Sequence, residues 1–219
     1  MKYLENSSLQ QISEKIGSAS NDCLLDFKLE SYSCKMIQSD KRQWKTTNLN
    51  ERQPLSPPED WSTLAAPIGH SHRMRHLSEH SCSGGSDHDG DELNYVDSIS
   101  KRTMFDLIAA LNTSYSDYDF SDVKSSTFSR MRDFESVVDA VDNKLSTAVG
   151  DKYRLLRDEL WQSIVEEIKP LECKIYSYNS GYDGDPFSEE GVFWGLTYFF
   201  YNKNLKQRPT KGNVYMLQS

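Results

Sequence analysis

The sequence predicts one α+β domain in which a mainly antiparallel sheet packs with helices and which a long disordered linker interrupts. Three observations carry this prediction. Helical periodicity recurs near the start and again after residue 100, strand periodicity appears on both sides of the interruption, and positions 39–97 show no apolar period. Because each ordered part is too small for a good core alone, we expect 1–38 and 98–206 to fold together, followed by an atypical tail, 207–219.

The N-terminal part, 1–38, predicts a helix followed by a strand. Leu9, Ile12 and Ile16 recur at helical spacing, and the glycine at position 17 offers a stop. Over residues 25–30 apolar and polar side chains alternate, which is the period of a strand with one solvent-exposed face. Such a strand needs a sheet to join, and we expect the C-terminal part to supply it.

Positions 39–97 are predicted to be a disordered linker because they combine proline, glycine and many serines with scattered charge. Two serines within it fit kinase sites. Ser56 precedes Pro57, which is the minimal proline-directed site, and Ser78 follows two arginines at the spacing of a basophilic site. A kinase reaches a disordered chain readily, and a phosphate adds about two negative charges, so Ser56 and Ser78 are candidate phosphorylation sites.

The C-terminal part, 98–206, predicts three amphipathic helices and then two strands. Gly150 and Pro170 offer stops for the second and third helices. The strand candidates are 172–178 and 192–201, joined by a loop rich in Gly, Asp and Ser. The apolar positions of the helices are Met104, Leu107, Ile108 and Leu111 in the first; Phe134, Val137, Val138, Val141 and Leu145 in the second; and Tyr153, Leu156, Leu160, Ile164 and Ile168 in the third.

Ten aromatic residues lie between positions 171 and 201. In the second strand candidate, Phe193 and Phe199 could fill a core, while Tyr198 and Phe200 would face the opposite side. A strand that is apolar on both faces is either covered by helices on both sides or carries an exposed binding patch. We expect most of these rings to be core and a few to remain for recognition.

Composition narrows the class of protein. The chain has 25 basic and 33 acidic residues, a net charge of −8, which argues against a general electrostatic affinity for nucleic acid. The longest apolar run, 192–201, is much shorter than the about 20 residues of a membrane-spanning helix. The four cysteines form no Cys-x-x-Cys pair and no secretory signal is read at the start, so we expect a reducing compartment, the cytosol or the nucleus.

The sequence contains little evidence for an enzyme active site. All five histidines lie in the predicted linker, so the predicted folded part cannot hold a Ser-His-Asp or Cys-His machine. Residues 76–80 match the H-x-x-E-H pattern of zinc peptidases but lack an apolar face to hold a helix. Asp183, Asp185, Glu189 and Glu190 could act as paired carboxylates, although a binding role is favoured. A metal-dependent hydrolase is therefore an alternative reading, and no catalytic residue, cofactor or metal ligand is assigned.

Several multi-residue motifs occur along the chain in a fixed order. They are Met1–Ser8, Glu30–Met36, Lys101–Thr103, Tyr118–Ser121, Glu172–Asn179, Asp185–Phe187 and Phe199–Lys203. In this order, on both sides of a divergent linker, they resemble the signature boxes of the Maf-one family, the repressors of RNA polymerase III.

The resemblance implies a repressor and not an enzyme. Members of that family bind the clamp region of RNA polymerase III near its initiation subunits, and they prevent the polymerase from joining TFIIIB at tRNA and 5S rRNA promoters. It further implies that TOR-dependent and cyclic-AMP-dependent kinases phosphorylate the linker and hold the protein inactive and cytoplasmic, until phosphatases act under stress and it enters the nucleus. We expect a monomer that uses no cofactor, membrane or direct nucleic-acid contact.

The resemblance also suggests residues for these roles. The candidates for contact with the polymerase are Tyr32, Lys35, Asp183, Asp185, Pro186 and Phe187. Acidic loop residues would suit a basic surface on a machine that handles nucleic acid. Ser56 and Ser78 fall in the regulatory linker. A scaffold or adaptor outside transcription is the milder alternative.

The end of the sequence departs from the family pattern. After Lys206 the family continues as an apolar strand, often followed by an acidic tail, whereas this chain has Pro209 within a polar stretch. Because proline cannot donate to a sheet ladder, we expect the strand to be missing or replaced.

Overall fold

A six-stranded antiparallel sheet organises the chain, in the order β1-β2-β8-β7-β6-β5. The computed structural model of the 219-residue chain describes residues 1–20, 24–47, 49–58, 97–179, 184–203 and 213–218, the last with side chains at 216 and 217 only. The strands are β1 (Lys2–Leu4), β2 (Lys28–Ser33), β5 (Phe128–Arg130), β6 (Lys174–Tyr178), β7 (Thr197–Asn202) and β8 (Asn213–Gln218). β8 pairs with β2 on one side and β7 on the other, so it joins the two parts of the chain into one sheet.

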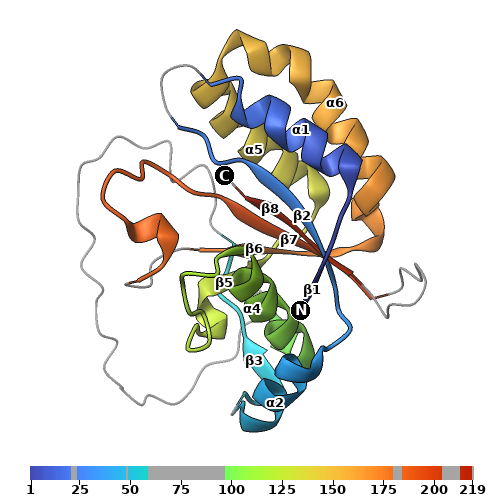
Figure 1. Cartoon of the computed structure of the whole chain (residues 1–219), viewed down its shortest axis with the longest axis vertical. Coiled ribbons are helices and arrows are strands. Elements are labelled where there is room, and N and C mark those ends of the chain that lie inside the picture. The colour runs from blue at the N-terminus through green and yellow to red at the C-terminus, as the bar shows by residue number, and fades with distance from the viewer. Residues whose placement is uncertain (21–23, 48, 59–96, 180–183, 204–212, 219) are drawn as a thin grey trace, which may run out of the picture. The chain divides into compact units, whose positions relative to one another are not determined.

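Helices cover both faces of this sheet (Figure 1). On one face lie α1 (Ser7–Gly17), α5 (Phe134–Val149) and α6 (Asp151–Ile168), and α6 packs against both others. On the other face lies α4 (Lys101–Ser114). The predicted α+β class with a mainly antiparallel sheet is thereby confirmed, and the folded unit joins the chain before Pro58 to the chain after Val96.

The aromatic residues of β7 fill both layers of the core. Phe199 belongs to the cluster under α4, whereas Phe200 faces the other layer, where its ring lies 6.1 Å from that of Phe134 on α5. Because both faces are covered, every residue of β7 is buried. Phe193 is the exception to the predicted core: it precedes the strand, which begins only at Thr197, and its side chain is 92% exposed.

The long helices end where the sequence predicts. The side chain of Asp133 accepts a hydrogen bond from the backbone N–H of Ser136 and so caps the start of α5. Gly150 separates α5 from α6 with φ at 68°, a left-handed value that suits glycine. α6 stops at Ile168, before Pro170. Among the described residues, no helix has the length and apolar character needed to cross a membrane.

Part of the predicted linker is ordered. Helix α2 (Gln38–Thr46) and strand β3 (Arg52–Pro54) lie within positions 39–97, and β3 pairs with β4 (Ser98–Ser100). The prediction of disorder from position 39 is therefore wrong for residues 39–47 and 49–58. Residues 59–96, which hold the five histidines and Ser78, lie outside the described residues.

The segment that contains α2 is held in place by individual contacts and lacks a periodic apolar face. The buried Asp40 carboxylate binds the Met1 ammonium at 2.9 Å and the Ile37 amide at 2.9 Å. The Trp44 ring packs edge-on against Phe105 of α4 with centroids 5.3 Å apart. Such isolated contacts leave no repeating pattern, and for that reason the polar composition suggested disorder.

The strand expected to be missing or replaced near the end of the sequence is present as β8 (Asn213–Gln218), so the first of these two alternatives is wrong. β8 lies between β2 and β7, and the side chains of Met216 and Leu217 are fully buried. The strand starts four residues after Pro209, which itself lies outside the described residues, so the proline does not interrupt the ladder. The run from Val214 to Leu217 has the apolar and aromatic character of a buried strand.

Candidate functional site: a basic pocket at one end of the sheet

A pocket of about 510 Å³ opens where β2 and β7 end. Three distant segments line it, and each belongs to one of the motifs noted in the sequence. They contribute Cys34, Lys35 and Met36 after β2, Arg102 and Asp106 on α4, and Tyr201 and Lys203 at the end of β7. The sheet register explains the meeting, because Asn213 of β8 lies opposite both Ser33 and Asn202.

The floor of the pocket is a buried hydrogen-bond network around Asp106. Its carboxylate, only 2% exposed, accepts hydrogen bonds from Arg102 Nε at 3.0 Å and from the Tyr201 hydroxyl at 3.1 Å. Arg102 also donates to the backbone carbonyl of Cys34. These bonds tie the three segments together, so the pocket has a fixed floor.

Burial influences the protonation of two groups in the pocket, the Asp106 carboxyl and the Cys34 thiol. Burial raises the pKa of Asp106, and the Arg102 guanidinium opposes that rise. Burial also raises the pKa of the Cys34 thiol to about 12, with the Asp106 charge adding to the effect. Cys34 therefore stays a neutral thiol and not a nucleophile at neutral pH.

The rim of the pocket is positively charged. Lys35 and Lys203 are exposed, and neither forms an ion pair with any residue that the structure describes. The Lys203 ammonium lies 5.9 Å from the centroid of the Tyr201 ring. Because Arg102 is paired with Asp106, the two lysines are the uncompensated charges of the pocket, in a chain whose net charge is −8.

The structure separates the predicted contact residues into exposed and internal ones. Lys35 lines the pocket. Tyr32 is 1% exposed, and its hydroxyl donates to Glu30 at 2.9 Å under α4, so its ring serves the core. Asp183 lies outside the described residues. A role for Lys35 or Asp183 in binding stays a prediction.

The Asp185-Pro186-Phe187 motif fixes a loop. The buried Asp185 carboxylate accepts hydrogen bonds from the Phe187 amide at 2.9 Å, the Ser188 hydroxyl at 2.9 Å and the Tyr178 hydroxyl at 3.2 Å. The Phe187 ring packs edge-on against the Tyr115 ring, with centroids 5.6 Å apart. The motif therefore shapes the loop before β7 from within.

The surface of this loop is carried by other residues. Glu189 and Glu190 are exposed and supply its acidic charge, and Phe193 supplies an exposed ring. If the loop contacts a partner, these side chains are the ones that the structure presents to it.

Ser56 is docked against the edge of the sheet. Its hydroxyl donates to the Ser126 carbonyl at 2.6 Å, its amide donates to the Phe128 carbonyl at 3.0 Å, and it forms a parallel bridge with Ser129. The neighbouring Leu55 is buried. A kinase would thus have to displace this segment from β5 before it could modify Ser56.

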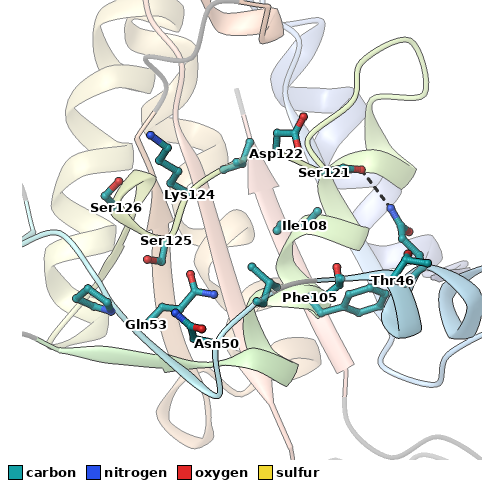
Figure 2. A pocket seen from close by; sticks show the side chains of 15 residues that line it. Thr46, Asn50, Gln53, Phe105, Ile108, Ser121, Asp122, Lys124, Ser125 and Ser126 are labelled. Atoms are coloured by element: carbon teal, nitrogen blue, oxygen red, sulfur yellow. Dashed lines mark hydrogen bonds between the residues drawn. The ribbon is translucent and has the colours of Figure 1, made fainter.

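A second pocket, of about 870 Å³, lies between α2, β3, α4 and residues 121–126 (Figure 2). Phe105 and Ile108 of α4 form part of its wall, and a hydrogen bond of 3.1 Å from Gln43 to Ser121 closes one side. Its other side chains are mainly neutral and polar. In the part of the chain that the structure describes, no group of three His, Cys, Asp or Glu residues could hold a metal ion.

Sequence reasoning missed most of the basic pocket. Arg102, Tyr201 and Lys203 lie in the motifs Lys101–Thr103 and Phe199–Lys203, whose patterns predict only a helix and a strand. The sequence offers one hint of the pocket, because three motifs each place a basic residue beside an apolar run. Only the order of the strands in the sheet shows that these residues lie close together.

Comparisons with known proteins identify relatives of the chain. A family model described as "Maf1 regulator" matches residues 25–208. A protein of Schizosaccharomyces pombe named "Repressor of RNA polymerase III transcription maf1" is 31% identical over 207 residues, which cover 94% of this chain and 79% of the relative. A Dictyostelium discoideum protein named "Repressor of RNA polymerase III transcription" is 39% identical over 110 residues, which cover 50% of this chain and 39% of the relative.

A solved structure shares the fold. The crystal structure of citrus MAF1 superposes with a TM-score of 0.59 at 24% sequence identity, and the match covers 96% of both chains. At this level of identity the likeness concerns the fold alone.

Proposed function

Since the chain belongs to the Maf1 regulator family, we propose that it represses transcription by RNA polymerase III. The observation that carries the proposal is the similarity over 94% of the chain to a yeast protein named as such a repressor. The resemblance that the ordered motifs suggested is confirmed by the family match over residues 25–208. The family is one of regulators and not of enzymes, which rules against the alternative of a metal-dependent hydrolase.

Repression acts through binding to the polymerase, which then cannot join TFIIIB at tRNA and 5S rRNA promoters. Two exposed features of opposite charge support a binding role. One is the basic rim with Lys35 and Lys203, and the other is the loop that presents Glu189, Glu190 and Phe193. Complementary charge at such surfaces favours correct orientation and rapid association with a partner.

Phosphorylation controls this activity, and Ser56 is the site whose surroundings support the idea. Its hydroxyl now donates a hydrogen bond to the Ser126 carbonyl. A phosphate on Ser56 would replace the donating hydroxyl with negatively charged acceptor oxygens that face the Ser126 carbonyl oxygen. The hydrogen bond would then be lost, and the segment around Ser56 would be repelled from the edge of the sheet at β5. Kinases and phosphatases are thus partners of the protein, and phosphorylation shifts it between cytoplasm and nucleus. Ser78 stays a second candidate.

The test is transcription of a tRNA gene with purified RNA polymerase III and TFIIIB, into which the unphosphorylated protein is titrated. We expect a dose-dependent loss of transcripts that disappears when the polymerase is already bound at the promoter. Undiminished transcription at micromolar protein would overturn the proposal. Ser56→Glu should repress more weakly than Ser56→Ala, and equal repression by both would remove Ser56 from the control mechanism while leaving repression intact.

A further inference from the structure

We propose that the basic end of the sheet is a binding site for an acidic peptide segment of the partner protein, with Lys35 and Lys203 as its principal contacts. The inference rests on the proposed function, because the partner is the polymerase, and it adds the chemistry of the contact. The occupant is a stretch of carboxylate side chains interspersed with apolar ones.

The charge of the pocket supports an anionic occupant. Of its four charged residues, Arg102 and Asp106 neutralise one another at 3.0 Å, which leaves Lys35 and Lys203. Both lysines are exposed residues that line the pocket. Met36 lines the same pocket and offers an adaptable apolar contact beside the two charges.

The positive charge continues along the same end of the sheet. Lys174 begins β6 and lies opposite Tyr201 in the register, and Arg130 ends β5. Burial lowers the pKa of Lys174, and the nearby cations Arg130, Lys203 and Arg52 lower it further. These groups are therefore close enough to repel one another, and Asp97, 3.6 Å from Arg130, offsets them only in part. An acidic segment that lies along this end would relieve that repulsion.

Arg102 serves the floor of the pocket more than its rim. A guanidinium fork binds carboxylate and phosphate groups alike in a bidentate bond. Here Nε is bound to Asp106 and a terminal guanidinium nitrogen to the Cys34 carbonyl, so two of the five N–H donors of Arg102 are already used in the floor of the pocket. The cations of the pocket without an ion-pair partner among the described residues are the two lysines, which act as flexible point charges and can each meet a carboxylate of an acidic segment.

The charge of the whole chain favours a peptide over nucleic acid. A net charge of −8 repels a long polyanion, whereas a short acidic segment meets only the local positive field. The positive side chains named here lie at one end of the sheet, whereas nucleic-acid binding draws on a wider basic footprint.

The experiment compares two charge-reversed proteins with the wild type. One carries Lys35→Glu and Lys203→Glu. The matched control carries Lys15→Glu and Arg154→Glu, which change the net charge equally on exposed positions of α1 and α6. Dissociation constants are measured for purified RNA polymerase III, for a fluorescein-labelled peptide that alternates Glu and Leu, and for a single-stranded oligonucleotide of equal charge. Thermal melting by circular dichroism confirms that all three proteins fold.

We expect the wild type and the control to bind the polymerase and the peptide alike, and the pocket variant to lose about tenfold or more in affinity for both. Binding of the peptide should weaken as salt rises. Equal peptide binding by all three proteins, or unchanged polymerase binding by the pocket variant, would overturn the inference and leave repression standing. Tighter binding of the oligonucleotide than of the peptide would overturn it in favour of nucleic acid.

The two proposals fail separately. If the wild type does not bind the polymerase, the proposed function fails, and the peptide measurement alone decides the inference. A tenfold difference between wild type and pocket variant on the peptide would then still support the site.

Discussion

Removing β8 should unfold the whole protein. A chain that ends at Gly212 lacks the strand between β2 and β7, so β1 and β2 lose their only pairing to the rest of the sheet that the structure describes. The remaining strands β5, β6 and β7 would expose a long apolar edge. We expect the truncated chain to lose cooperative melting.

The expected loss of stability can be estimated from the side chains that β8 buries and from the hydrogen bonds that it forms with β2 and β7. The side chains of Met216 and Leu217 are buried, and burial contributes about 1.5–3 kcal/mol for each. β8 also pairs over its whole length with β2 and with β7, which amounts to roughly ten ladder hydrogen bonds at about 1 kcal/mol each. The sum is about 13–16 kcal/mol, whereas domains of this kind have a total stability of about 5–15 kcal/mol.

The assay is thermal and urea unfolding followed by circular dichroism. Leu217→Ala serves as the control, because it should cost about 2–5 kcal/mol and still leave a cooperative transition. If the truncated chain melts cooperatively within a few degrees of the full chain, β8 does not hold the sheet together and the reasoning fails.

Three further predictions concern single residues. Gly195→Ala would place a methyl group 2.4 Å from the Phe187 ring and should lower the free energy of unfolding by about 1–3 kcal/mol; an unchanged urea midpoint would contradict that contact. Because burial raises the pKa of Cys34 from 9.0 to about 12, its thiolate fraction at pH 8 should be about a thousandfold below that of an ordinary thiol. Mass spectrometry should therefore find that iodoacetamide labels Cys34 much more slowly in the folded chain than in the urea-unfolded chain. Equal labelling rates would refute the burial of Cys34. Tyr201→Phe removes the hydroxyl that donates to Asp106 and should cost about 1.5–3 kcal/mol in chemical unfolding, whereas a loss near zero would show that the network does not depend on it.

The sequence predicted the elements that repeat a pattern and missed those that do not. α5 and α6 carry apolar residues at helical spacing over many turns, with Gly150 between them, so their existence could be predicted. β1 and β5 have three residues each, which is too short for a period to appear. α2 depends on the contact between Asp40 and the Met1 ammonium, and no local pattern announces a contact across 39 positions.

The candidate site was predictable only in part, for a related reason. Motifs indicate which residues matter, but they do not say which side of a strand faces the solvent. Lys35 was predicted and lines the pocket, whereas Tyr32 and Asp185 come from equally prominent motifs and are buried. Asp185 can be buried because three hydrogen bonds satisfy its carboxylate and offset the cost of its desolvation.

The pairing of β3 with β4 bears on how this family can change over evolution. The Leu55 amide donates to the Asp97 carbonyl at 2.8 Å, so one hydrogen bond holds together two points of the core between which residues 56–96 lie in the sequence. For a flexible loop with fixed ends, doubling the number of residues costs only about 0.6 kcal/mol of closure entropy. Insertions and deletions between Leu55 and Asp97 can therefore accumulate without disturbing the sheet, so the length of this segment can change while the core stays the same.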